Sequence, residues 1–148
     1  MFRSPFLLPF RPLLSLRTMS AYVGSITTHE LAVKLNQGTD NLVVFDVRDS
    51  DFKGGNIIGA VNIPSEEFRV RLQDTVTRYR DKDTIVVHCM MSQVRGPTCA
   101  NMLAQELARQ GNTQQKVVVL QGGFSNWAAV FAKEKPQLIE NFIPQFYM

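Results

Sequence analysis

The chain has 148 residues, of which 45% are hydrophobic and 20% charged, and its formal net charge is +3. This size and composition predict a single folded domain, and no apolar run approaches the roughly 18–20 residues that span a bilayer. The positive excess comes from Arg3, Arg11 and Arg17, because the rest of the chain holds 13 basic and 13 acidic residues. A basic surface on the folded domain, which nucleic-acid binding requires, is therefore not expected.

Residues 1–18 are basic and apolar, contain serines and lack acidic residues. This composition is typical of a mitochondrial transit peptide, although Pro5, Pro9 and Pro12 would interrupt the amphipathic helix that such peptides form. The alternative is an extension ahead of a second start at Met19. Either way, we place residues 1–18 outside the folded domain and leave mitochondrial targeting open.

The first half of the domain alternates strand, helix and strand patterns. Residues 22–26 predict a short strand, and a helix capped by Thr27 or Thr28 follows and ends at Gly38. The apolar run within residues 41–47 predicts a strand buried on both faces. A turn at Gly54 and Gly55 then precedes a short edge segment at residues 60–64.

The second half continues the alternation. Ser65 is expected to cap a helix whose apolar stripe faces the sheet, and residues 84–88 predict another buried strand. A helix should then run from Gly96 to about Gln110. Residues 116–120 predict a further strand, which leads through a glycine pair into a helix containing Trp127 and Phe131.

Together these elements predict an α/β fold with a mainly parallel central sheet and helices on both faces. In such sheets ligands bind beyond the carboxyl ends of the strands, where the loop after residue 88 would lie. The domain is expected to cover residues 20–135. The apolar tail at residues 136–148 should pack on the domain or on a partner.

The run from His88 to Arg95 carries the strongest chemical signal. A strand, a tight loop and a helix start would direct successive backbone N–H groups inward, which forms an anion-binding concavity. Arg95 adds a planar fork suited to two oxygens of a tetrahedral oxyanion. The positive potential favours a thiolate at Cys89, which makes it a nucleophile. The alternative is that Cys89 is simply a small buried residue.

Three other residues have two interpretations each. Cys99, about one helical turn beyond Arg95, could resolve an oxidised Cys89 or belong to the core. Asp46, at the carboxyl end of a strand and near Asp49 and Asp51, could be a general acid or a hydrogen-bonding turn residue. For Trp127, a core position is favoured over a substrate platform.

The motifs around this loop resemble a known family. His-Cys-x5-Arg is the signature of cysteine-dependent phosphatases, and residues 46–49, 59–64 and 120–127 resemble rhodanese landmarks in rhodanese order. The resemblance covers roughly residues 20–135. It is closest to the rhodanese-fold, cell-cycle dual-specificity phosphatases and the eukaryotic arsenate reductases. Residues 92–100 are especially similar to plant members to which both activities are assigned.

This resemblance implies roles for the loop. Cys89 would be the nucleophile and Arg95 the oxyanion clamp, with substrate bound by the backbone of the intervening loop, Met90, Met91, Ser92, Gln93 and Val94. Ser92 could also donate its hydroxyl to the thiolate, while His88 would brace the loop. The substrate would be a phosphorylated molecule or arsenate, and arsenate reduction would need an external thiol such as glutathione with glutaredoxin. No bound cofactor or metal is expected.

Two alternatives to this function remain. Sulfurtransferase rhodaneses usually carry a loop one residue shorter, and non-catalytic rhodanese modules usually lose the cysteine or the arginine. The chain also departs from the family pattern. Asn56 replaces the usual histidine, Met90 and Met91 replace acidic loop residues, and the zinc-binding cysteines of plant members are missing. With two cysteines, the chain is expected to be reduced and intracellular, in cytoplasm or nucleus.

Overall fold

The computed structural model describes residues 21–147, so the predictions for residues 1–18 lie outside the described part of the chain. A five-stranded sheet in the order β1-β6-β5-β2-β4 forms its centre, with every neighbouring pair parallel. Its strands are β1 (Val23–Ile26), β2 (Leu42–Asp46), β4 (Val61–Asn62), β5 (Thr84–His88) and β6 (Lys116–Leu120). This confirms the predicted mainly parallel sheet.

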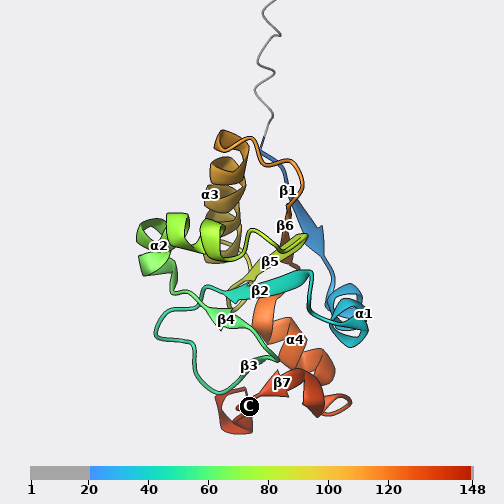
Figure 1. Ribbon diagram of the computed structural model, residues 1–148. Helices are drawn as coiled ribbons and strands as arrows, with labels where there is room; N and C mark the ends of the chain where they lie inside the picture. The colour runs from blue at the N-terminus through green and yellow to red at the C-terminus, as the bar shows by residue number, and fades with distance from the viewer. Residues whose placement is uncertain (1–20, 148) are drawn as a thin grey trace, which may run out of the picture.

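Helices cover both faces of the sheet, as Figure 1 shows. On one face lie α2 (Ser65–Arg78) and α3 (Arg95–Arg109), and their apolar side chains form one core cluster with the inward residues of the strands. On the other face lie α1 (Thr28–Gln37) and α4 (Gly123–Phe131), which build a second cluster around the fully buried Trp127. The core interpretation of Trp127 is therefore confirmed.

The predicted elements agree closely with the observed ones, although α3 begins at Arg95 and not at Gly96, and the antiparallel pairing of residues 56–57 with 139–140 was not predicted. The predicted cap of the first helix is confirmed, because Thr27 accepts the backbone N–H of Glu30 and Gly38 is the C-cap. Ser65, in contrast, is the first residue of α2 and Pro64 is the N-cap residue, so the prediction that Ser65 caps this helix was wrong. The Ser65 hydroxyl instead donates to Asp49 Oδ2 at 2.6 Å, because that carboxylate reaches over the start of α2 and accepts the Glu66 N–H as well.

The chain after α4 packs back on the domain. A short helix, η1 (Pro136–Leu138), leads into β7 (Ile139–Glu140), which pairs antiparallel with β3 (Asn56–Ile57). A last short helix, η2 (Pro144–Phe146), ends the described chain beside β3 and β7 (Figure 1). Leu138 and Ile139 are buried. The tail therefore packs beside the segment that joins β2 to β3.

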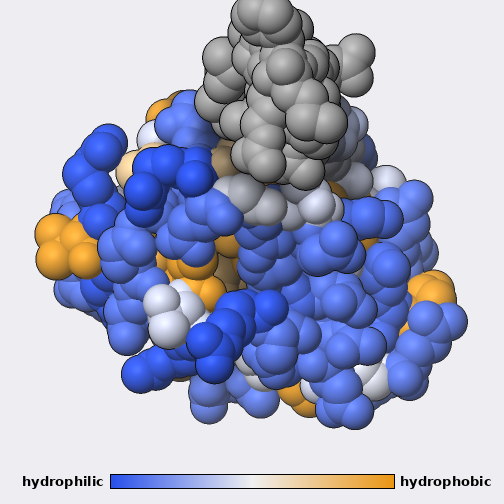
Figure 2. Space-filling model, turned by 45° about the horizontal axis from the view of Figure 1, so that its top comes forward, coloured by the Kyte–Doolittle hydropathy of each residue, from blue (hydrophilic) through white to orange (hydrophobic). Residues whose placement is uncertain are grey.

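The face of the molecule that Figure 2 shows is mainly polar. In Figure 2 hydrophilic side chains predominate, and hydrophobic ones form small separate areas. Within residues 21–147, no helix is both long and apolar enough to cross a membrane.

The register of the two central strands positions the site. Residues of β2 and β5 pair from Leu42 with Thr84 to Asp46 with His88, so both strands end at the same level. The segment 47–55 and the loop 89–94 therefore leave the sheet side by side at its carboxyl edge, where ligands bind in open parallel sheets.

Candidate active site

Cys89 lies directly after β5, at the base of the loop that leads to α3. Cys89 is only 3% exposed, and its Sγ accepts a hydrogen bond from the Gly96 N–H at 3.3 Å. That N–H belongs to the first turn of α3, where the helix dipole and unpaired donors favour negative charge. The sulfur therefore sits where a thiolate would be stabilised.

The loop 89–94 presents free backbone donors. Among the described residues, none of the N–H groups of residues 90–95 donates to a protein acceptor. Ser92 has a φ of 53°, the left-handed conformation that helps successive N–H groups to converge in an anion-binding concavity. Its hydroxyl oxygen is buried without a partner, so no bond from Ser92 to Cys89 is seen.

The start of α4 orients two peptide groups of this loop. The carbonyls of Cys89 and Met90 accept the N–H groups of Phe124 and Ser125, at 3.0 and 2.9 Å. Because a trans peptide directs its C=O and N–H in opposite directions, the N–H groups of Met90 and Met91 point away from α4. Gly123, with a φ of 60°, allows this close approach, since an added Cβ would lie 2.5 Å from the Cys89 carbonyl oxygen.

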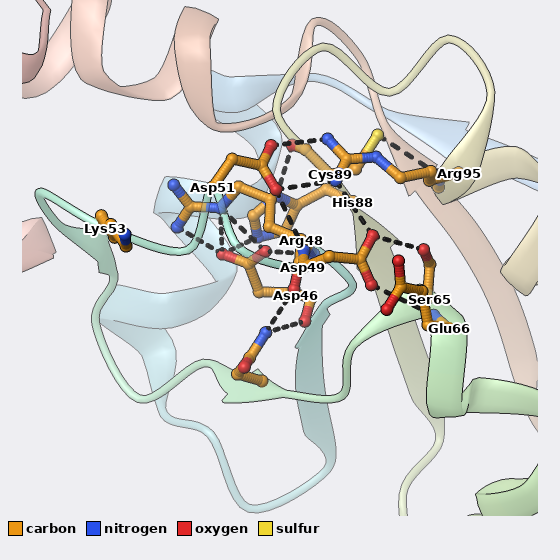
Figure 3. A network of polar contacts seen from close by, with 12 residues as sticks. Asp46, Arg48, Asp49, Asp51, Lys53, Ser65, Glu66, His88, Cys89 and Arg95 are labelled. Atoms are coloured by element: carbon orange, nitrogen blue, oxygen red, sulfur yellow. Dashed lines mark hydrogen bonds and ion pairs between the residues drawn. The ribbon is translucent and has the colours of Figure 1, made fainter.

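Arg95 is the first residue of α3, and its guanidinium meets two carboxylates of the segment 47–55 (Figure 3). Nη1 donates to Asp51 Oδ1 at 2.7 Å and Nη2 to Asp51 Oδ2 at 2.6 Å. Nη1 also donates to Asp49 Oδ2 at 3.2 Å. These ion pairs raise the pKa of Arg95 further above its already high value, with the Asp51 hydrogen bond as the largest cause. The guanidinium is therefore permanently charged beside Cys89.

Sequence reasoning had placed Asp49 and Asp51 near Asp46 without finding their partner. The sequence nevertheless contained an indication of this contact. Asp49 and Asp51 follow β2 closely, and Arg95 ends the loop that follows β5, the strand that pairs with β2. Strands that end at the same sheet edge bring such residues together.

Beneath the loop lies a buried ionic cluster. Asp46 and Arg48 are both fully buried, and Arg48 Nη2 donates to Asp46 Oδ2 at 2.7 Å and to the Gly55 carbonyl at 2.8 Å. The Arg48 guanidinium also stacks on Phe124, 4.3 Å from the ring centroid. This engagement supports the turn-residue interpretation of Asp46, because a carboxylate fully buried against an arginine does not reach a substrate.

His88 braces the loop from below. Its Nδ1 lies 3.0 Å from the Cys89 carbonyl oxygen, to which it can only donate, so the neutral ring turns an unprotonated Nε2 toward Asp46. That Nε2 is buried without a hydrogen-bond partner, 3.6 Å from Asp46 Oδ2. Burial lowers the pKa of His88, although Asp46 acts in the opposite direction.

Cys99 lies in α3 on the face that packs against the sheet. It is 1% exposed, and burial raises its pKa to about 12. Both facts favour the core interpretation over a resolving thiol, because attack on another sulfur requires a thiolate. Among residues 21–147, no three His, Cys, Asp or Glu side chains are grouped so that they could hold a metal ion.

The sheet order, the landmarks and the loop geometry agree with one family. The rhodanese-like domain family matches residues 27–130, which is more than half of the chain. The chain belongs to the rhodanese family. Within this rhodanese domain, Cys89 and Arg95 both fall inside the matched segment.

Relatives of this rhodanese domain include proteins with named activities. The dual specificity phosphatase Cdc25 of Arabidopsis thaliana is 37% identical over 92 residues, which are 60% of this chain and 63% of that protein. The chain thus matches less than two thirds of this relative's length.

Solved structures of rhodanese proteins are also similar. A yeast protein tyrosine phosphatase of the rhodanese family has a TM-score of 0.77 and 26% identity, covering 85% of this chain and 97% of the yeast chain. The As-Sb reductase from Leishmania major has a TM-score of 0.71 and 29% identity, covering 80% of this chain and 85% of that one.

Proposed function

We propose that this rhodanese domain is a cysteine-dependent enzyme acting on a tetrahedral oxyanion, as a phosphatase of the tyrosine or dual-specificity type that can also reduce arsenate. One observation carries the proposal. Cys89 Sγ sits on the first turn of α3 at the base of a loop whose N–H groups at residues 90–95 have no protein acceptor among the described residues. These N–H groups are free to donate to a ligand, and a bound oxyanion would accept from several of them at once.

The phosphatase reaction would proceed in two displacements. The Cys89 thiolate attacks phosphorus in line, a sulfur–phosphorus bond forms, and the bond to the leaving oxygen breaks as that oxygen takes a proton. Water then attacks the cysteinyl-phosphate, releasing phosphate and the thiolate. The N–H groups of the loop and Arg95 would bind the negative oxygens in both steps, because fixed donors stabilise charge that develops on them.

Arsenate reduction would share the first step. The thiolate attacks arsenic and displaces water, after which an external thiol completes reduction. As(V) takes two electrons and becomes arsenite, while the thiols lose two electrons and end as a disulfide. The likeness to the Leishmania As-Sb reductase supports this second activity. The reductant would be a thiol such as glutathione, which ends in a disulfide with Cys89, and glutaredoxin would be the partner that reduces this disulfide and frees the Cys89 thiolate.

Two alternatives fit the site less well. A sulfurtransferase would be expected to carry a loop one residue shorter, suited to a persulfide. A non-catalytic rhodanese module would have no need of both Cys89, which begins the loop, and Arg95, which follows it as the first residue of α3.

The test is to assay the purified chain on three substrates: an aryl phosphate, arsenate with glutathione and glutaredoxin, and thiosulfate with cyanide. We expect activity on the first two, and a loss of roughly a thousandfold or more in Cys89→Ser, because the nucleophile is removed. Cys99→Ser, which changes the other cysteine, should retain the activity. A wild-type protein inert on phosphate and arsenate, or an active Cys89→Ser variant, would show that the proposal is wrong.

A further inference from the structure

The hydrogen bonds of Arg95 leave one particular edge of its guanidinium free. A guanidinium has five N–H groups, and three of them are engaged by Asp51 and Asp49, two from Nη1 and one from Nη2. Among the described residues, Nε and the second N–H of Nη2 have no acceptor. These two N–H groups are parallel neighbours on one side of the planar group, which is the fork that can hold two oxygens.

We infer that Asp51 and Asp49 are positioning residues for oxyanion binding, holding Arg95 so that its Nε–Nη2 edge is left for two oxygens of the substrate. This inference rests on the proposed function and deepens it. Asp51 accepts two short hydrogen bonds, one from Nη1 and one from Nη2. Asp49 accepts a hydrogen bond from the other N–H of Nη1. The carboxylates thus use the donors that the substrate does not need.

Both carboxylates stay charged in the free protein. The hydrogen bond from Arg95 lowers the pKa of Asp51, against an opposing effect of burial. Burial alone would raise the pKa of Asp49, but hydrogen bonds from Ser65, the Glu66 N–H and Arg95 together lower it. A carboxylate that is ionised at neutral pH is a poor proton donor, so its geometry and its charge both suit positioning.

The segment that carries these carboxylates is held along its length. Asp49 is fixed at the start of α2 by Ser65 and Glu66, and the Asp49 N–H donates to Asp51 Oδ1 at 3.0 Å. Further along, the Gly54 carbonyl accepts the Ile143 N–H at 2.9 Å, and the Lys53 carbonyl accepts the Tyr147 hydroxyl at 3.0 Å. The tail therefore supports the segment, and a carboxylate on a fixed segment can hold an arginine in one orientation.

The opposite effect would be competition. If Asp51 occupied Arg95 in place of the substrate, the oxyanion would have to displace it, and removing its charge would tighten binding. The two possibilities predict opposite signs, so one substitution separates them.

The experiment measures protection of Cys89 from iodoacetamide by sodium arsenate or phosphate, with the alkylated residue identified by mass spectrometry. We expect Asp51→Asn to need about tenfold more oxyanion for half-protection, since one well-formed bidentate charge-assisted contact orients the clamp. Asp51→Ser should behave alike. Asp40→Asn, the same charge change at an exposed residue before β2, should match the wild type.

A double-mutant cycle tests whether Asp51 acts through Arg95. In an Arg95→Ala background, Asp51→Asn should have no further effect on half-protection. Equal or tighter protection in Asp51→Asn, or the same loss with and without Arg95, would overturn the inference while leaving the proposed function intact. A wild-type protein that no oxyanion protects would instead overturn the proposed function, and the inference with it.

Discussion

At the scale of single residues, the site combines ionised groups at its surface with a buried neutral histidine below. Arg95 and its two carboxylates are about one third exposed or less and stay charged. His88, in contrast, is fully buried and holds the Cys89 carbonyl. The loop therefore depends on a group whose protonation would place a second positive charge beside Arg48.

The pH dependence of stability should report this histidine. Because burial lowers the pKa of His88 below its ordinary value of 6.5 in the folded protein, the unfolded chain binds the extra proton first as the pH falls. The free energy of unfolding should be at its full value above pH 6.5 and decrease below it, by up to about 1.4 kcal/mol per pH unit. Denaturant unfolding at pH 8, 7, 6 and 5 measures this slope.

His88→Asn should flatten the slope below pH 6.5, whereas His29→Asn on the exposed side of α1 should keep it. A wild-type stability that does not change from pH 7.5 to 5 would contradict the prediction. Asp49 and Asp51 affect stability in a separate pH range. Because their pKa values are lowered in the folded protein, protonating them reduces the free energy of unfolding only below about pH 4.

At the scale of elements, the contact between the catalytic loop and the start of α4 has no room for a side chain. A Cβ at Gly123 would lie 2.5 Å from the Cys89 carbonyl oxygen and 2.6 Å from that of Met90, both backbone atoms. The two hydrogen bonds from α4 to the loop depend on this approach. The glycine pair that begins α4 is thus a condition for the loop's shape.

Gly123→Ala should therefore lower the free energy of unfolding by about 2–4 kcal/mol and weaken oxyanion protection of Cys89 in the alkylation assay. The matched control is Gly111→Ala. Gly111 has a φ of 70°, similar to Gly123, but nothing lies within 4 Å of an added Cβ there. Only the backbone cost of about 1 kcal/mol applies to it. Equal losses in the two variants would mean that the close approach does not matter.

Much of this arrangement could be predicted from the sequence, for identifiable reasons. The strands are continuous apolar runs, and the predicted bounds of β5 and β6 are those observed. The Cys-x5-Arg spacing likewise identified the loop. The start of α2 was placed one residue late, because the Asp49 carboxylate, distant in sequence, accepts both the Ser65 hydroxyl and the Glu66 N–H at the start of the helix.

The ion pairs of Arg95 could not be predicted from local patterns. They join residues more than forty positions apart, and whether they form depends on the register of β2 against β5. The burial of Arg48 was equally hidden, since arginine is seldom fully buried. Its position becomes intelligible only with the Gly55 carbonyl, Asp46 and the Phe124 ring around it.

At the scale of the whole molecule, the tail connects the end of the described chain to the site. It covers β3, packs Tyr147 near Phe124 with ring centroids 5.5 Å apart, and bonds to two carbonyls of the segment 47–55. That segment carries Asp51, so the tail acts on Arg95 without touching it.

Removing residues 141–148 should lower the free energy of unfolding by about 2 kcal/mol or more, because aromatic contacts are lost together with hydrogen bonds to the domain, among them those to the Gly54 and Lys53 carbonyls. It should also weaken oxyanion protection of Cys89 several-fold, measured beside thermal unfolding. Tyr147→Phe keeps the ring and loses the hydroxyl bond to Lys53, so its loss should be smaller on both measures. A truncated chain with wild-type protection would show that the tail does not support the site.

The buried Arg48 has a consequence for spectroscopy. Its Nε–H donates to both oxygens of Asp46 at 3.0 Å and lies wholly out of contact with water. Exchange of that proton with solvent therefore requires the surrounding chain to open, and its resonance in a ¹⁵N spectrum should persist at neutral pH, where exposed arginine side chains lose theirs. The exchange rate of this one proton would then report how often the chain segments around Arg48 open to solvent.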